Sequence, residues 1–581
     1  RGIGHEKVLT RLKFDDQAER LLSEAGKNHE TVLAKDEIFY LCSAGNLSMG
    51  GTAIDMTDVV HPDNREMAVR AIKSIGLDVG GVDFLTDDIT QSYKDIGGAI
   101  VEVNAAPGFR MHVAPSEGKP RDVAAAVMDM LFPPGTPSQI PIAGITGTNG
   151  KTTTSRMLSH ILKTSGHIVG MTSTDGVYID GHLTVKGDMT GPVSAQMVLR
   201  DPSVDIAVME VARGGMLRTG VGFRNCDVAA CLNVSGDHLG LRGIETVEQL
   251  ARVKRILIEI ATNTAVLNAD DTLCLEMANH TKAENICYIT LADNHPLVRA
   301  HIRAEGRAVV LEKGLNGDMI TMYDKGSHIP LLWTHLIPAT MEGKAVHNVQ
   351  NAMFAAALAF SLGKPPDDIR HGLRTFNTTF FQAPGRMNVF DEHPFKVILD
   401  YAHNAAAFKG MCHLVSRLET IGKNICVISM PGDRRDEDIA EVGNIVSGVF
   451  DYFICKADDN RRKRGYDEIP QMLRKTLLEN GVSADAIELI PDEVESIQRG
   501  LSLAEPGDLM IVFGDNVTRC WKQIINFNQD EELPTSTKTT EPIFEDSAES
   551  FVEPFTLGAG QRFIRDERGV RLDHVVEEED D

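Results

Sequence analysis

Continuous apolar runs alternate with amphipathic stretches through most of the chain. One series lies at residues 142–145, 205–211 and 228–234, and a second at 396–401, 425–430, 452–456 and 509–513. Strands that are buried on both faces of a parallel sheet have this unbroken apolar character. The alternation therefore predicts two α/β domains, which the sequence around Ala383-Pro384-Gly385 separates.

The first 133 residues have a different organisation. Met67, Ala71, Ile72 and Ile75 recur at helical spacing before a strand-like run at 81–85, and a further strand is expected at 100–103. The proline-rich stretch 133–137 is typical of a linker. We predict domains at 1–133, 134–384 and 385–530, and a flexible tail at 531–581 because its composition turns to Glu, Asp, Ser, Thr and Pro.

Composition excludes several classes of protein. The net charge is −25, and the last 51 residues alone hold fifteen acidic against five basic side chains, which argues against a nucleic-acid-binding surface. The longest apolar run, residues 352–360, is too short to span a membrane, so no membrane partner is expected. Nine scattered cysteines without a CxxC pair fit a reducing cytoplasm.

The most informative segment is GITGTNGKTT at 144–153, which follows a predicted strand and opens a predicted helix. Glycines let backbone N–H groups surround phosphate oxygens, and the helix N-terminus adds favourable partial charge. Lys151 would reach the terminal phosphates and the Thr152 hydroxyl would bind Mg²⁺. The predicted nucleotide-binding residues are Gly144, Gly147, Thr148, Asn149, Gly150, Lys151, Thr152 and Thr153. The plainer alternative is a glycine-rich turn before a helix.

The longer GxxGTNGKT form resembles the ATP-binding loop of the Mur ligase family, which includes folylpolyglutamate synthetases and makes amide bonds through an acyl phosphate. The resemblance implies that Glu210 binds magnesium and that His238, in a DHL-like motif, binds a second magnesium. Lys254 stands where several members carbamylate a lysine to hold that metal. A solvated strand-end carboxylate, a structural histidine and a surface lysine are the respective alternatives.

Further positions match the same family in order. The segments of Asn268 and Asn351 resemble those beside the nucleotide, although either residue could serve a turn or a helix cap. Arg386 resembles the arginine that reaches the ATP phosphates, and Asp400 and His403 lie in a DYAH motif that contacts the nucleoside. The catalytic set that the resemblance implies is Lys151, Glu210, His238 and Arg386.

The N-terminal segment carries a second nucleotide signature. Asp83, Glu102 and Asn104 resemble the metal-binding end of ATP-grasp ligases, where such residues hold Mg²⁺. Spacing of i and i+2 on one strand places Glu102 and Asn104 on the same face, and oxygen ligands suit that ion. Alone, the E-x-N pattern is weak.

The string at 108–115, joined to a Mur-type module, resembles the cyanophycin synthetase family, with further similar blocks at 2–7, 46–52, 432–438 and 515–519. The resemblance implies a partial ATP-grasp domain, a Mur ligase-like P-loop domain and a Rossmann-like C-terminal α/β domain. It also implies ATP and Mg²⁺ as cofactors, L-arginine, L-aspartate and a cyanophycin primer as partners, and a cytoplasmic homo-oligomer. An N-terminal domain and the first half of the ATP-grasp fold are expected to be absent from this chain. Cys42 stands where the family usually has arginine, so we do not expect the ATP-grasp reaction from this chain alone.

Arginine specificity has no clear motif. Asp433, Arg434 and Asp436 could bind the substrate guanidinium, or they could form a self-satisfied salt-bridged loop. Three other functions stay open: a ligase for another amino acid or a cell-wall precursor, a related enzyme that polymerises preformed dipeptides, and a non-catalytic remnant that binds polymer. The dipeptide enzyme is expected to have a degraded phosphate loop, which this sequence does not show.

Overall fold

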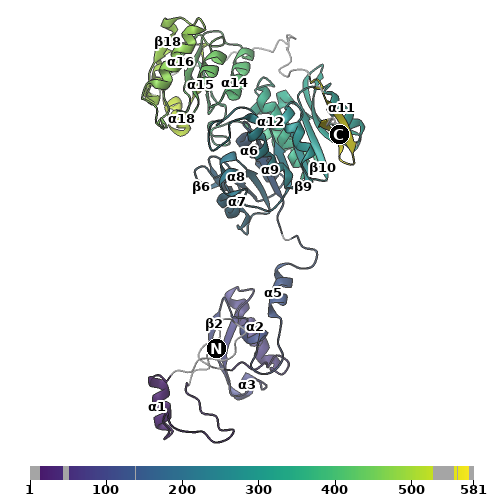
Figure 1. The fold of residues 1–581 in the computed structure, drawn as a ribbon, viewed down its shortest axis with the longest axis vertical. Helices are drawn as coiled ribbons and strands as arrows, with labels where there is room; N and C mark the ends of the chain where they lie inside the picture. Colours follow the sequence, from purple (N-terminus) through teal and green to yellow (C-terminus); the bar gives the residue numbers. More distant parts are fainter. Residues whose placement is uncertain (1–13, 43–51, 138, 528–554, 559, 575–581) are drawn as a thin grey trace, which may run out of the picture. The chain divides into compact units, whose positions relative to one another are not determined.

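The chain folds into two compact units, residues 1–139 and 140–581 (Figure 1). The computed structural model describes residues 14–42, 52–137, 139–527, 555–558 and 560–574. Across these residues, no helix combines the length and the apolar character that crossing a bilayer demands.

The first unit is built on a two-stranded antiparallel sheet with short helices around it. Its helix α2 begins after the His61 cap and ends at Gly76, whose positive φ of 81° closes the last turn. The helix and the two strands predicted here are confirmed. The elements are α1 (Asp16–Glu24), α2 (Pro62–Ile75), β1 (Gly81–Leu85), α3 (Tyr93–Ile96), β2 (Ala99–Asn104), α4 (Arg110–Val113) and α5 (Val123–Leu131).

The second unit begins with an eleven-stranded mixed sheet that we call, with its helices, the middle lobe. The strand order is β13-β12-β11-β10-β9-β8-β3-β7-β4-β5-β6, parallel from β11 to β4 and antiparallel at both edges. The strands are β3 (Ile142–Thr146), β4 (Val169–Thr172), β5 (Gly176–Ile179), β6 (His182–Lys186), β7 (Ile206–Glu210), β8 (Cys226–Cys231), β9 (Ala261–Asn268), β10 (Asn285–Thr290), β11 (Arg307–Gly314), β12 (Gly317–Asp324) and β13 (Ser327–Trp333).

Helices cover both faces of this sheet, which explains why its central strands are apolar throughout. One face packs against α6 (Lys151–Thr164), α12 (Val346–Ser361) and α13 (Pro366–Thr375). The other face packs against α7 (Pro192–Leu199), α8 (Arg213–Thr219), α9 (Val247–Glu259), α10 (Thr272–Glu276) and α11 (Pro296–Arg303).

A six-stranded sheet forms the C-terminal lobe, in the order β14-β15-β19-β16-β17-β18. All pairs are parallel except β14 with β15. Its strands are β14 (Asn388–Phe390), β15 (Lys396–Asp400), β16 (Asn424–Ile428), β17 (Tyr452–Cys455), β18 (Ile487–Leu489) and β19 (Leu509–Phe513). Its helices are α14 (Ala405–Arg417), α15 (Asp436–Val446), α16 (Glu468–Glu479), α17 (Glu493–Leu503) and α18 (Val517–Ile525). The predicted α/β class of both lobes is confirmed.

The prediction of a flexible tail is wrong for part of 531–581. The strands β20 (Gln561–Asp566) and β21 (Gly569–His574) pair as an antiparallel hairpin, drawn in yellow beside α11 in Figure 1. Leu572 is fully buried in the core of the middle lobe, and the Val570 N–H donates to His301 Nδ1 at 2.9 Å. Composition misses this hairpin because a few alternating apolar residues inside an acidic stretch are enough to anchor it.

Candidate active site

The phosphate loop connects β3 to α6 and is fixed from one side by an asparagine. Gly147 and Gly150 adopt φ angles of 155° and 84°, which favour glycine. The backbone N–H groups of Thr148 and Asn149 donate to Asn233 Oδ1 at 3.1 and 2.9 Å. The first turn of α6 has no side-chain cap, so its N–H groups stay available to an anion.

The two asparagines predicted to lie near the nucleotide are held by hydrogen bonds within the protein. A Cβ on Gly150 would lie 2.2 Å from Asn351 Oδ1, which places Asn351 directly against the loop. Asn351 Nδ2 donates to Asn348 Oδ1 at 3.0 Å. Asn268 Nδ2 donates to the Leu232 carbonyl at 2.8 Å. Both amides therefore have partners inside the protein.

A buried carboxylate meets the Thr152 hydroxyl at the end of β7. Glu210 is 1% exposed, and Thr152 Oγ1 lies 3.1 and 3.0 Å from its two oxygens. Burial raises the pKa of Glu210, although attraction to Lys151 and Arg386 opposes the rise. Carboxylate and hydroxyl oxygens in a buried position are the donors that Mg²⁺ prefers, so these residues fit a magnesium ion.

Cations from both lobes act on the buried carboxylate of Glu210. Burial is the main influence on the pKa of Lys151 and lowers it, and Lys151 Nζ donates to the Thr148 carbonyl at 2.8 Å. Arg386, which follows the lobe boundary, lies 3.4 Å from Thr152 Oγ1 through NH2. Its guanidinium lies 5.3 Å from the centre of the Tyr401 ring. The site thus needs both lobes.

Asp400 lies beside this arginine. Its Oδ2 accepts a hydrogen bond from the Met387 N–H at 2.9 Å, and burial raises its pKa. The carboxylate therefore holds the segment that carries Arg386, a role that the resemblance does not predict.

His238 and His403 meet Asp237 at the boundary between the lobes. Their ligand atoms lie within 4.8 Å of one another, close enough to hold a metal. However, Arg434 places NH1 2.9 Å from His238 Nδ1 and NH2 3.0 Å from Asp237 Oδ1. Burial lowers the pKa of His238 to about 4, and the neighbouring guanidinium acts in the same direction. A metal ion does not fit beside His238 while this arginine is there.

Lys254 is 4% exposed and points at the phosphate loop. Its Nζ donates to the Gly147 carbonyl at 2.7 Å. Burial lowers the pKa of Lys254 to about 8, and Lys151 adds repulsion. In this arrangement the lysine holds the loop as a hydrogen-bond donor.

The candidate substrate residues are paired with one another or with neighbours. Asp433 contacts Arg434 at 3.0 Å and also Arg462, and Asp436 contacts Arg464 at 2.7 Å. These pairs favour the alternative of a salt-bridged loop.

In the first unit, Asp83 lies opposite Glu102 across β1 and β2, and Asn104 Nδ2 lies 3.5 Å from Asp83 Oδ1. The three candidate ATP-grasp ligands thus lie on adjacent strands. Cys42 Sγ lies 3.6 Å from Gln17 Oε1. The similar block at 2–7 and most of the block at 46–52 are outside the described residues.

Sequence reasoning missed three supporting residues. Asn233 fixes the loop, Asp237 contacts Arg434, and Asn404 exchanges hydrogen bonds with Asn149 at 3.0 and 2.9 Å across the lobes. All three are inside motifs that the sequence displays, so position within a motif is the signal that could have found them.

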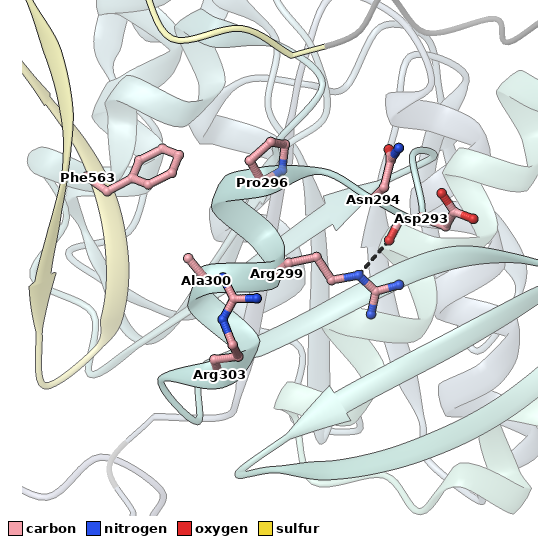
Figure 2. A pocket seen from close by; sticks show the side chains of 7 residues that line it. All are labelled: Asp293, Asn294, Pro296, Arg299, Ala300, Arg303 and Phe563. Carbon is pink, nitrogen blue, oxygen red and sulfur yellow. Dashed lines mark hydrogen bonds between the residues drawn. The ribbon is translucent and has the colours of Figure 1, made fainter.

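A separate hollow of about 560 Å³ lies between α11 and β20 (Figure 2). It is lined by Asp293, Asn294, Pro296, Arg299, Ala300, Arg303 and Phe563, and Arg299 Nε donates to the Asp293 carbonyl at 2.6 Å. It shares no residue with the phosphate-loop site.

Comparison with known domain families gives the class of the protein. Residues 145–359 match the Mur ligase middle domain, and residues 385–516 match the Mur ligase glutamate ligase domain. The fold agrees: a folylpolyglutamate synthase of Mycobacterium tuberculosis, solved with ADP and AMPPCP, aligns with a TM-score of 0.50 at 18% identity over 70% of this chain and 95% of that one. The phosphate loop and its two lobes are thus those of a Mur-type ligase.

Curated relatives narrow the class. The cyanophycin synthetase of Crocosphaera subtropica is 46% identical over 89% of this chain and 59% of its own length. That of Geminocystis herdmanii is 45% identical over 92% of this chain and 60% of its own length. This chain is similar to cyanophycin synthetases along about nine tenths of its own length, and it spans about three fifths of the length of these relatives.

Proposed function

We propose that the two lobes form an ATP-dependent, magnesium-requiring ligase that joins L-arginine to the side-chain carboxylate of aspartate in a cyanophycin primer. The observation that carries this proposal is the convergence of Thr152, Glu210 and Lys151 with Arg386 from the other lobe. A triphosphate bound at the start of α6 would have donors and cations on two sides. The resemblance to cyanophycin synthetases supplies the substrates.

Each residue has a distinct part in the proposed reaction. Lys151 and Arg386 offset negative charge on the transferring phosphoryl group, since a preorganised cation acts strongly in a site that excludes water. Glu210 and Thr152 would hold Mg²⁺, which supplies further charge neutralisation when bound. The aspartate carboxylate attacks the γ-phosphorus of ATP and ADP leaves, which gives an acyl phosphate. The α-amine of arginine then attacks the acyl carbon, phosphate leaves, and the nitrogen loses a proton as the amide forms. Closure of the lobes keeps water from this intermediate.

We further propose that residues 1–133 derive from an ATP-grasp module that adds aspartate to the polymer backbone. Asp83, Glu102 and Asn104 would be its magnesium ligands. Cys42, where the family usually has arginine, argues against an ATP-grasp reaction by this segment alone. A cytoplasmic homo-oligomer is the assembly that the family suggests.

The test is ADP release by the purified chain with Mg·ATP, aspartate-based primer and arginine. Activity should require all three, and radiolabelled arginine should appear in the polymer. Lys151→Ala should abolish it. Lys163→Ala is the matched control, because Lys163 lies on the same helix with a half-exposed side chain that pairs with Asp180.

Two outcomes would replace the proposal. Incorporation of another amino acid in preference to arginine would indicate a Mur-type ligase of different specificity. Polymer binding without ADP release would indicate a non-catalytic remnant.

A further inference from the structure

Arg434 is a buried cation at the boundary between the lobes. It leaves the C-terminal lobe in the loop between β16 and α15, and its side chain is 3% exposed. Its NH2 lies 3.0 Å from Asp237 Oδ1, a carboxylate of the middle lobe whose side chain is 12% exposed. A buried guanidinium needs such partners, since removing it from water without them is costly.

A second set of contacts holds the arginine in place. Arg464 donates to the carbonyls of Gly432 at 3.0 Å and Arg434 at 2.8 Å, which fixes the backbone on both sides of Asp433. Asp433 also contacts Arg434 at 3.0 Å and pairs with Arg462. The loop is therefore shaped to direct Arg434 toward the other lobe.

The middle-lobe end of this contact is equally fixed. His238 adopts φ of 55°, an unfavourable backbone conformation for a non-glycine residue, and faces the guanidinium with its ring nitrogens. His403 of the C-terminal lobe lies 3.8 Å from the second oxygen of Asp237. Asp237 is thus approached by two side chains from across the boundary.

We propose that Arg434 is a positioning residue that latches the two lobes in the arrangement where Arg386 reaches Thr152. This inference rests on the proposed function, because closure matters only if the cleft performs phosphoryl transfer. It assigns Arg434 to the protein's own interface and not to recognition of the substrate arginine.

Two physical reasons support a latch. Arg386 belongs to the C-terminal lobe, so its 3.4 Å approach to Thr152 depends on how that lobe is held. Among the other side-chain contacts across this boundary, those between Asn149 and Asn404 are neutral amide pairs. Arg434 and Asp237 instead form a largely buried ion pair, and opposite charges attract more strongly away from water, so this pair contributes more to holding the lobes than the neutral amides do.

Lobe separation can be measured without any substrate. Leu315 of the middle lobe and Ile421 of the C-terminal lobe are fully exposed, so each can be replaced by an azide-bearing amino acid and labelled with dyes for energy transfer. This route avoids the nine native cysteines. Arg434→Met should lower the transfer efficiency, and Asp237→Asn, which keeps the side-chain size, should change it in the same direction.

The matched control is Arg435→Met. Arg435 adjoins Arg434, but its side chain is 45% exposed and pairs with Asp438 of its own lobe. Its loss should leave the transfer efficiency unchanged. Arg434→Lys should restore part of the closed population, because an ammonium can still pair with Asp237.

Kinetics then separate a latch from a general structural role. Arg434→Met should lower kcat at least tenfold while the affinity for ADP, bound mainly by the middle lobe, changes less than threefold. Unchanged transfer efficiency in both Arg434→Met and Asp237→Asn would overturn the latch, whatever the activity. If the unsubstituted chain lacks ligase activity but Arg434→Met and Asp237→Asn still lower the transfer efficiency, the latch is retained and the proposed function is refuted.

Discussion

The C-terminal hairpin should loosen from the middle lobe as the pH falls. His301 is buried, its Nδ1 accepts the N–H of Val570 at 2.9 Å, and its Nε2 lies 3.1 Å from the Ile286 carbonyl. The ring therefore accepts and donates at once, which only the neutral form can do. Protonation would place an N–H against the N–H of Val570.

The magnitude follows from the pKa. Burial lowers the pKa of His301 to about 4, and nearby Asp566 opposes the shift only weakly. Against an ordinary value of about 6.5, the difference corresponds to at most about 3 kcal/mol for docking, because the ring also contacts Tyr288 and the Ile286 carbonyl of the middle lobe and keeps part of its burial without the hairpin. Below about pH 6.5 the undocked ring binds a proton more readily than the docked ring, so docking weakens as pH falls toward 4. At pH 5 the loss should be at most about 2 kcal/mol.

The assay is hydrogen exchange of the peptide that spans β20 and β21, corrected for the intrinsic pH dependence of exchange. His301→Asn keeps an acceptor for Val570 but cannot titrate, so its opening free energy should vary less with pH. His328→Asn is the control, because His328 is half-exposed on β13. The reasoning fails if the unsubstituted hairpin has the same opening free energy at pH 7.5 and pH 5.

Three further changes have expected outcomes. Glu210→Gln should abolish ligase activity yet raise the melting temperature of the ligand-free chain, because a neutral amide does not carry the cost of a buried carboxylate with a raised pKa. A lowered melting temperature would contradict this. Gly150→Ala should destabilise the loop and abolish nucleotide binding, whereas Gly166→Ala, with φ of 89° but nothing within 4 Å of the new Cβ, should keep binding by calorimetry. Lys456→Met should cost roughly 1–3 kcal/mol in urea unfolding because it removes one partner of buried Glu493, which keeps Arg519 and two backbone N–H groups, and adding Glu493→Gln should recover part of the loss.

Sequence reasoning succeeds where a pattern is local. The run at 142–145 is apolar because helices cover both faces of the sheet, so the strand can be predicted without tertiary information. The glycines of the phosphate loop have the positive φ angles that the motif suggests. Both features depend on residues that are neighbours in the chain.

It fails where a side chain's partner is distant in the sequence. In the sequence Arg434 is one charge among several in its loop, and only the structure brings it to Asp237, 197 residues earlier in the numbering. Asn351 resembles a residue beside the nucleotide, and only the structure shows that it also packs against Gly150. The hairpin at 561–574 is hidden by the acidic composition around it.

Because the hairpin packs into the core of the middle lobe, the C-terminal lobe is an insertion within the fold of the middle lobe. Leu572 completes a core to which Tyr288 and Leu297 also belong. During synthesis, that part of the core stays open until residues 561–574 leave the ribosome, since domains otherwise tend to fold as the chain emerges. A stop codon just before the hairpin would therefore leave an apolar surface on the nucleotide-binding lobe, and aggregation of the nascent protein would be its earliest consequence.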